Sequence, residues 1–202
     1  MTAADDPISV VPANQASWED LETVLGTRGP AAQCQCQRYK LERKESFASV
    51  PVEERAFRLR QQADCGHPES DTTSGLVAYL GVEPVGWCAV EPRTAYAGLL
   101  RNSNRVAWLG RDEDRADESI WAVTCVFTRA GFRRDGVSRA LVRATVDFAR
   151  ERGAMALEGY PMTTTNAIDE ELHVGTVTTF AAAGFIEVSR PTLRRAVMRI
   201  DF

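Results

Sequence analysis

The feature that most constrains the fold is a segment from Ser119 to Thr128 that is apolar at nearly every position. It is rich in aromatic and β-branched residues, as is typical of a central strand covered on both faces. An Arg- and Gly-rich turn follows, and then apolar residues recur at helical spacing from Val137 to Phe148, before Gly153. Ala154 to Tyr160 is a second short apolar strand, closed by Pro161. The pattern predicts a strand, helix, strand unit with parallel strands.

The flanking segments predict further elements of both kinds. Ser17 can cap a short helix that ends before Gly26, and a second helix starts after Pro51 and ends near Cys65 to Pro68. From Gly75 the period changes to that of a β-hairpin, with runs at 76–80 and 85–90. We expect a long loop over 93–118, a short helix over about 175–183 and a half-exposed strand at the C-terminus.

Length and composition exclude several classes of protein. A chain of 202 residues favours one domain, and 44% apolar with 26% charged residues is typical of a soluble globular fold. The net charge is −4, which supplies no basic field for nucleic acid. We find no apolar run of membrane-spanning length and no signal in Met1 to Asp6. We therefore expect a cytoplasmic protein without nucleic-acid or membrane partners, whose five cysteines remain thiols.

The turn between the central strand and its helix has the chemistry of an anion site. A helix start presents unpaired N–H groups and a partial positive charge, so it can hold phosphate oxygens when side chains leave room. Gly136 and Ser138 leave that room, and Arg133, Arg134 and Arg139 add positive charge. Without further context, an ordinary solvated turn remains the alternative.

The pattern Arg133-x-x-Gly136-x-Ser138 resembles the Arg/Gln-x-x-Gly-x-Gly/Ala signature of the Gcn5-related N-acetyltransferase (GNAT) superfamily. Phe180 to Phe185 resembles the aromatic-x-x-x-Gly-Phe element that follows in the same families. The resemblance covers about residues 75–202. It implies an α/β (α+β mixed) fold, with a central mixed, largely antiparallel sheet and a strand-loop-helix-strand acyl-CoA-binding core flanked by helices. We expect one domain over 1–202, in which 1–74 supplies an N-terminal strand and helices on the acceptor side and 75–202 the acyl-CoA core and C-terminal strands.

The resemblance also implies a ligand, acetyl-CoA or another acyl-CoA, with its pyrophosphate on the amides of the turn. Its pantetheine arm would pair with the central strand like an added strand, and a backbone N–H near Val126 or Phe127 would polarise the thioester carbonyl. The cofactor-binding residues expected on this basis are Cys125, Val126, Phe127, Thr128, Arg133, Arg134, Asp135, Gly136, Val137, Ser138, Arg139 and Phe180.

The residues for proton transfer are less well marked. Many family members carry a tyrosine as general acid where this chain has Phe180, so the thiolate leaves unassisted or takes its proton from water, or Tyr160 or His173 substitutes. Glu158, on the strand after the helix, is a candidate base or amine anchor, and equally a structural hydrogen-bond acceptor. His173 is alternatively a surface or capping residue. The catalytic candidates are thus Glu158, Tyr160 and His173.

Two further groups of residues leave alternatives open. The acidic loop at 112–118 could attract a cationic amine or simply be solvated. Cys34, Cys36, Cys65 and His67 offer zinc ligands, but one residue between paired ligands is too few for a structural site, so no metal is expected. Such thiols otherwise pack as small apolar groups, or the Cys34 to Tyr39 segment lines the acceptor cleft.

We therefore expect an acyl-CoA-dependent N-acetyltransferase that transfers an acetyl group to a primary amine by direct attack in a ternary complex. The alternative is a catalytically silent acyl-CoA-binding or metal-stabilised regulatory module, which the phenyl ring of Phe180 keeps open. The partners implied are acyl-CoA and an amine acceptor, of small-molecule or protein origin, with a homodimer left open.

Overall fold

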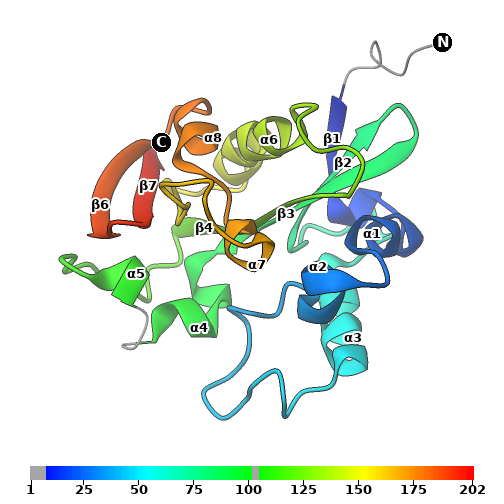
Figure 1. Ribbon diagram of the computed structural model, residues 1–202, viewed down its shortest axis with the longest axis horizontal. Coiled ribbons are helices and arrows are strands. Elements are labelled where there is room, and N and C mark those ends of the chain that lie inside the picture. Colours follow the sequence, from blue (N-terminus) through cyan, green and yellow to red (C-terminus); the bar gives the residue numbers. More distant parts are fainter. Residues whose placement is uncertain (1–7, 102–104) are drawn as a thin grey trace.

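The strands of the protein form one sheet of seven, in the order β1-β2-β3-β4-β5-β7-β6 (Figure 1). The computed structural model describes residues 8–101 and 105–202, so the expectation drawn from Met1 to Asp6 lies outside the described residues. The β4–β5 pair is parallel and every other pair is antiparallel, which confirms the mixed, largely antiparallel sheet. The strands are β1 (Ile8–Pro12), β2 (Gly75–Leu80), β3 (Glu83–Pro92), β4 (Ile120–Thr128), β5 (Ala156–Gly159), β6 (Ile186–Thr192) and β7 (Arg195–Asp201).

Strands β4 and β5 diverge in the middle of the sheet. They pair only from Ile120 to Val123 with Ala156 to Gly159, whereas β4 continues to Thr128. At the point of divergence Ala89 of β3 lies opposite Cys125 and Val90 opposite Val123, so Thr124 is an extra residue that forms a bulge in β4. The bulge and the short β5 together open the β5-side edge of β4.

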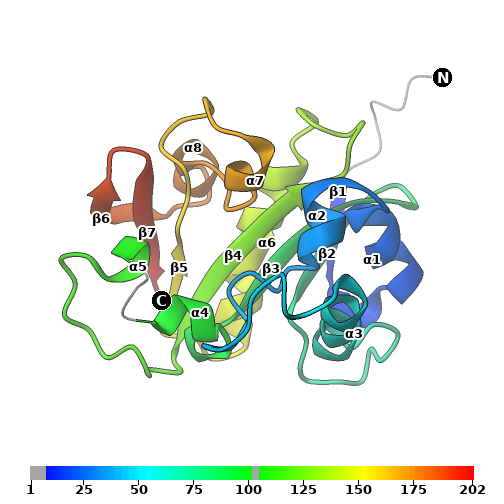
Figure 2. The same ribbon diagram turned by 60° about the horizontal axis from the view of Figure 1, so that its bottom comes forward.

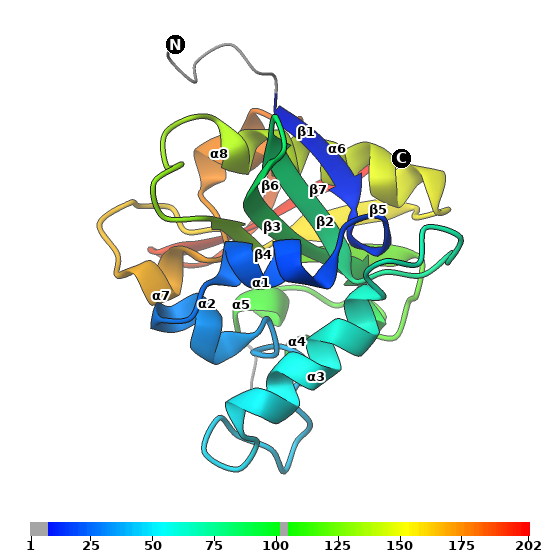
Figure 3. The same ribbon diagram turned by 90° about the vertical axis from the view of Figure 1, so that its right-hand side faces the viewer.

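Helices cover both faces of the sheet (Figure 3). Helices α6 (Val137–Glu151) and α8 (Val177–Ala181) pack on one face, where the largest apolar cluster lies. Helices α1 (Trp18–Leu25) and α3 (Val52–Ala63) cover the N-terminal strands on the other face, and α4 (Ala97–Leu100) and α5 (Arg105–Trp108) contribute to a third cluster beside β7. The remaining elements are α2 (Gly29–Cys34), α7 (Asp169–Leu172) and the 3₁₀ turns η1 (Ala13–Gln15) and η2 (Arg93–Ala95).

The helices and strands with strong periodicity follow the sequence closely. The hydroxyl of Ser17 accepts a hydrogen bond from the Asp20 N–H at 3.0 Å, so it caps α1 as expected. The hairpin, the β4-α6-β5 unit and the C-terminal strand are all present. The predicted loop over 93–118 was wrong in part, because η2, α4 and α5 lie within it, each too short to show a period.

Candidate active site

A cavity of 480 Å³ lies beyond the β4 bulge, on the side of β4 that β5 leaves uncovered. Three parts of the chain line it: the end of β4 with the turn into α6, the segment around α2, and the segment from α7 to α8. Figure 2 shows α2 on one side of the carboxyl end of β4 and α7 on the other. The cavity therefore joins the predicted acyl-CoA core to the N-terminal region.

The β4 wall contains the four strand residues predicted to contact the cofactor, Cys125, Val126, Phe127 and Thr128. Successive N–H groups of a strand point to opposite edges, and the Arg129 N–H donates to the Val85 oxygen of β3. By this alternation Phe127 also faces β3, whereas Val126 faces the cavity. The Val126 N–H indeed donates to the His173 carbonyl oxygen at 2.6 Å. Of the two amides considered, only that of Val126 is aimed at an incoming carbonyl.

The turn before α6 contributes three of its predicted residues to the cavity, Arg133, Arg134 and Ser138. Arg134 has a φ of 78°, a left-handed conformation that costs a non-glycine residue about 1 kcal/mol or more and that is concentrated at functional sites. Four other predicted residues do not line the cavity: Asp135, Gly136, Val137 and Arg139.

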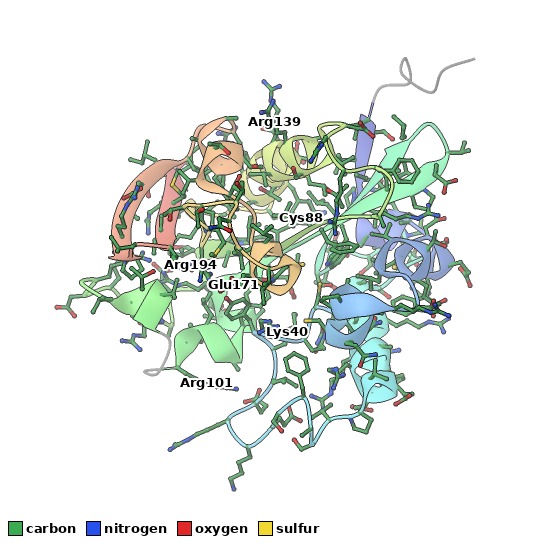
Figure 4. The ribbon with its side chains drawn as sticks, viewed as in Figure 1. Lys40, Cys88, Arg101, Arg139, Glu171 and Arg194 are labelled. Carbon is green, nitrogen blue, oxygen red and sulfur yellow. The ribbon has the colours of Figure 1, made fainter. Side chains whose placement is uncertain are left out.

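Each residue of the turn that stays off the cavity has a different position. Val137 is buried in the core beside Gly86, and Asp135 is exposed. A Cβ on Gly136 would point toward Ile8, 4.0 Å from its Cδ1 atom. Arg139 points away from the cavity (Figure 4). Of the predicted residues from Arg133 to Arg139, the cavity lining therefore includes only three.

The opposite wall comes from the N-terminal region, including Cys34, Cys36 and Arg38. The Cys34 to Tyr39 segment thus lies along the cavity, one of the alternatives open for it. The Cys36 sulfur accepts a hydrogen bond from the Trp87 Nε1 at 2.8 Å. The adjoining Cys125 thiol and burial hold the pKa of Cys36 well above its ordinary value, and burial raises the pKa of Cys34. Both thiols are therefore protonated at neutral pH, which makes them poor nucleophiles.

The other two zinc-ligand candidates lie apart from this wall. The His67 Nδ1 is 2.8 Å from an oxygen of Asp64, at the end of α3, and neither Cys65 nor His67 lines the cavity. Within residues 8–101 and 105–202, no group of three or more His, Cys, Asp or Glu side chains is arranged to hold a metal ion.

Glu158 lies in a buried cluster of charges rather than on the cavity. Its side chain is fully buried and accepts hydrogen bonds from Arg111, from Arg199 at 3.0 Å and from the Tyr160 hydroxyl at 2.9 Å, with Arg93 at 3.5 Å. Burial acts to raise the pKa of Glu158, but the hydrogen bonds and charges of Arg111 and Arg93 outweigh it and lower the pKa. The carboxylate is thus held ionised by its neighbours, an arrangement typical of a structural ion cluster.

Tyr160 and Phe180 are also buried and do not line the cavity. Burial, followed by the Glu158 charge, raises the pKa of Tyr160 well above its ordinary value. Phe180 packs edge-on against Phe185, with ring centroids 5.1 Å apart, and covers Gly159 so closely that a Cβ there would lie 2.1 Å from the ring. Of the three catalytic candidates, only His173 lines the cavity.

The acidic loop is engaged within the protein. Glu113 pairs with Arg111 and Arg199, and an Asp117 oxygen accepts hydrogen bonds from Ser119. None of its residues lines the cavity. Arg93 and Tyr96, at the start of the segment that leads from the hairpin to this loop, are fully buried.

Five polar residues of the cavity were not singled out from the sequence, although Arg38 lies within the Cys34 to Tyr39 segment: Arg28, Arg38, Thr165, Thr176 and Thr179. The arginines flank α2, a six-residue helix whose sequence Gly-Pro-Ala-Ala-Gln-Cys has no apolar period. Thr176 is the N-cap of α8 and accepts a hydrogen bond from the Thr179 N–H. A Thr four residues before Phe180, the start of the aromatic element, is a capping signal that could have located this wall.

The sequence profile of the acetyltransferase (GNAT) family matches residues 37–169, about two thirds of the chain. The chain belongs to this family. The match spans β2 to β5 and the turn before α6, so the family assignment rests on the same segments that build the β4 wall. No curated protein matches the sequence of this member.

Solved structures share the GNAT fold at low sequence identity. A ribosomal-protein-alanine N-acetyltransferase from Brucella melitensis is 16% identical with a TM-score of 0.53, covering 97% of this chain and 99% of its own. PaiA N-acetyltransferase from Thermoplasma acidophilum, in complex with coenzyme A, is 12% identical, with a TM-score of 0.51 and coverage of 97% and 99%. YncA from Salmonella typhimurium, with its cofactor acetyl-CoA, is 12% identical, with a TM-score of 0.53 and coverage of 96% and 93%.

This GNAT family member has no helix, among those described, that is long and apolar enough to cross a membrane.

Proposed function

We propose that the protein transfers an acetyl group from acetyl-CoA to a primary amine, by direct attack of the amine on the thioester in a ternary complex. One observation carries the proposal. A single cavity contains the Val126 N–H, aimed at a carbonyl oxygen, together with the arginine-bearing turn before α6. These are the two requirements of the cosubstrate, because its thioester needs a donor for the carbonyl oxygen and its pyrophosphate needs positive charge.

Each part of this cosubstrate has a counterpart in or beside the cavity. The His173 oxygen on the Val126 N–H has the position that a thioester carbonyl oxygen would take, so binding exchanges one carbonyl for another. Arg133, Arg134 and the first turn of α6 at Ser138 would hold the phosphates. The segment Leu172 to Thr176 then has to move, because its backbone lies along the edge that the pantetheine arm would pair with.

The reaction forms a C–N bond and breaks the C–S bond. The amine reaches the carbonyl carbon as the neutral base and loses a proton after attack, and the departing thiolate gains one. The protonated thiols of Cys34 and Cys36 argue against an acyl group carried on either. Because Phe180 has no hydroxyl, we assign the proton donor to water or to the His173 imidazole on the cavity wall. We assign Glu158 and Tyr160 a positioning role beneath the site.

Binding of acetyl-CoA by calorimetry tests the first half of the proposal. Ser138→Glu places a carboxylate in the cavity, where it repels phosphate, yet an acid in the first turn suits the helix dipole and leaves the fold intact. We expect Ser138→Glu to lose binding, while Ser138→Ala keeps it and both unfold near the parent temperature.

A matched pair of arginines provides the control for charge. Arg134 lines the cavity, so Arg134→Gln should raise the Kd for acetyl-CoA about ten- to hundredfold, which corresponds to the loss of one charge-assisted hydrogen bond. Arg139→Gln, in the first turn of α6 and pointing away from the cavity, should change the Kd by less than about threefold. Equal effects of the two substitutions would contradict the placement of the phosphates.

Release of CoA in the presence of amines tests the second half of the proposal, the transfer of the acetyl group. Turnover with an amine panel supports the transferase. Tight binding of acetyl-CoA without turnover of any amine supports the silent binding module, the alternative that Phe180 keeps open.

A further inference from the structure

The charges around the cavity are all of one sign. Arg28, Arg38, Arg133 and Arg134 line it, and no Asp or Glu does among the side chains that the structure describes. Arg133 and Arg134 belong to the turn assigned to the phosphates, whereas Arg28 and Arg38 come from the opposite wall, one on each side of α2. Positive charge thus extends to the acceptor wall, where it attracts an oxyanion and repels a polycation.

A second hollow, of 350 Å³, adjoins the cavity at α2. It shares Gly29, Pro30 and Arg38 with the cavity and adds Gln33 and Phe47, but contains no residue of β4 or of the turn before α6. Within the described part of the chain, Arg38 is the only charged side chain common to both. It therefore lies where a molecule could reach both the Val126 amide and space away from the phosphates.

The surroundings of Arg38 are fixed by a buried arginine. The Arg55 side chain is 4% exposed and donates to the backbone oxygens of Gln33 at 2.9 Å, of Phe47 at 3.1 Å and of Val50. Its guanidinium lies 4.9 Å from the Phe47 ring centroid, and that of Arg38 lies 5.6 Å from the same centroid. Arg55 thus holds the ring against which Arg38 rests.

Arg38 itself is exposed, and no carboxylate of the described residues forms an ion pair with it. A guanidinium without a carboxylate partner at the junction of two hollows is suited to bind a carboxylate of another molecule, in the two-pronged geometry that arginine provides.

We propose that the acyl acceptor is a primary amine carrying a carboxylate, and that Arg38 binds this carboxylate. The inference rests on the proposed transferase function. Because Arg38 and Val126 line one cavity of 480 Å³, a single small molecule that carries both groups, such as a free α-amino acid, is the acceptor that we propose. The amino acid's own side chain then lies in the second hollow, over Phe47.

The test compares matched amines as acceptors. The panel contains L-phenylalanine, L-leucine and L-glutamate, the α-carboxamide of each, O-phosphoethanolamine and spermidine, with CoA release as the readout. We expect the acids to exceed their carboxamides at least tenfold in kcat/KM, with spermidine inactive.

Variants of Arg38 locate the effect. Arg38→Gln should raise the KM for the acids about ten- to hundredfold, while the acetyl-CoA Kd and the kcat stay within about twofold. Arg38→Lys should recover part of the loss. Arg43→Gln is the control, because Arg43 is exposed on the same connecting segment and lines neither hollow. We expect this variant to have the KM, kcat and acetyl-CoA Kd of the parent.

Several results would overturn the inference while the transferase function stands. One is a kcat/KM for the carboxamides or for spermidine that equals that of the acids, and another is a higher kcat/KM for O-phosphoethanolamine. A third is an Arg38→Gln variant that binds acetyl-CoA more weakly but leaves the KM for the acceptor unchanged. If acetyl-CoA binds without turnover, calorimetry of L-phenylalanine on the CoA complex decides. If L-phenylalanine binds to the parent complex but not to the Arg38→Gln complex, the carboxylate site is supported. If L-phenylalanine does not bind to the parent complex, the carboxylate site is refuted. Failure of the parent to bind acetyl-CoA refutes the transferase, and with it the acceptor assigned to it.

Discussion

Glu158→Gln separates a structural carboxylate from a catalytic one. The substitution keeps the shape of the side chain but removes the only fully buried negative charge among the described partners of Arg93, Arg111 and Arg199. Arg93 is fully buried and the Arg111 side chain is 5% exposed, so their charges cannot turn to water. The new amide N–H₂ group also faces donors where an acceptor is needed.

The magnitude follows from this burial. Breaking a buried ion pair by removing one partner costs about 3–5 kcal/mol, because the remaining charge is left uncompensated. At about 2–4 °C per kcal/mol for a chain of this length, the unfolding midpoint should fall by about 6–20 °C. Glu113→Gln is the matched control. Glu113 pairs with the same arginines, but its side chain is 41% exposed. The substitution should therefore lower the free energy of unfolding by no more than about 1 kcal/mol.

The pH dependence has a definite sign. The pKa of Glu158 is lower in the folded protein than in the unfolded chain, so its stabilisation is complete above the unfolded value of about 4.3 and is lost as the pH falls toward the folded value. The difference between parent and Glu158→Gln should therefore be constant near neutral pH and shrink below about pH 4. Thermal unfolding at several pH values measures it. A variant that unfolds with the parent but loses turnover would refute the structural role and favour a catalytic one.

Two further substitutions test the packing around the site. Gly159→Ala should cost about 1–3 kcal/mol in chemical denaturation, since its Cβ would lie 2.1 Å from the Phe180 ring, and an unchanged denaturation midpoint would mean that the ring moves freely. Lys40→Met should destabilise most at neutral pH, because the Lys40 Nζ is 2.5 Å from the Glu91 carboxylate and burial already raises the pKa of Glu91. The loss should shrink toward pH 4 as Glu91 protonates, and a loss independent of pH would show that Lys40 acts through packing alone.

The sequence predicts the parts of the fold whose signals are local. The β4-α6-β5 unit is marked by a change of period and by a glycine-bearing turn, and it forms as expected. The residue pattern did not locate strands β1 and β6, although the family resemblance implies an N-terminal strand and more than one C-terminal strand. The first is five residues long and ends in Pro12, and the second is an edge strand whose exposed side chains hide its alternation.

The site is less predictable because its partners are distant in the chain. Glu158 meets Arg93, Arg111 and Arg199 only after β3, β4, β5 and β7 have paired, so a strand carboxylate is indistinguishable from a base in the sequence. Arg38 likewise reaches the cavity through the fold of the segment between α2 and α3, which no periodicity marks.

The hydrogen bond from the Val126 N–H to the His173 oxygen also bears on the solubility of the folded chain. The divergence of β4 and β5 leaves a strand edge in the middle of the sheet, and such edges are templates on which other chains can add strands. The segment that ends at Thr176 covers this edge with a single main-chain contact of 2.6 Å, without forming a ladder of its own there. The same bond therefore hinders pairing of this edge with other polypeptides, and as one bond it is weak enough to yield to the cosubstrate that we propose.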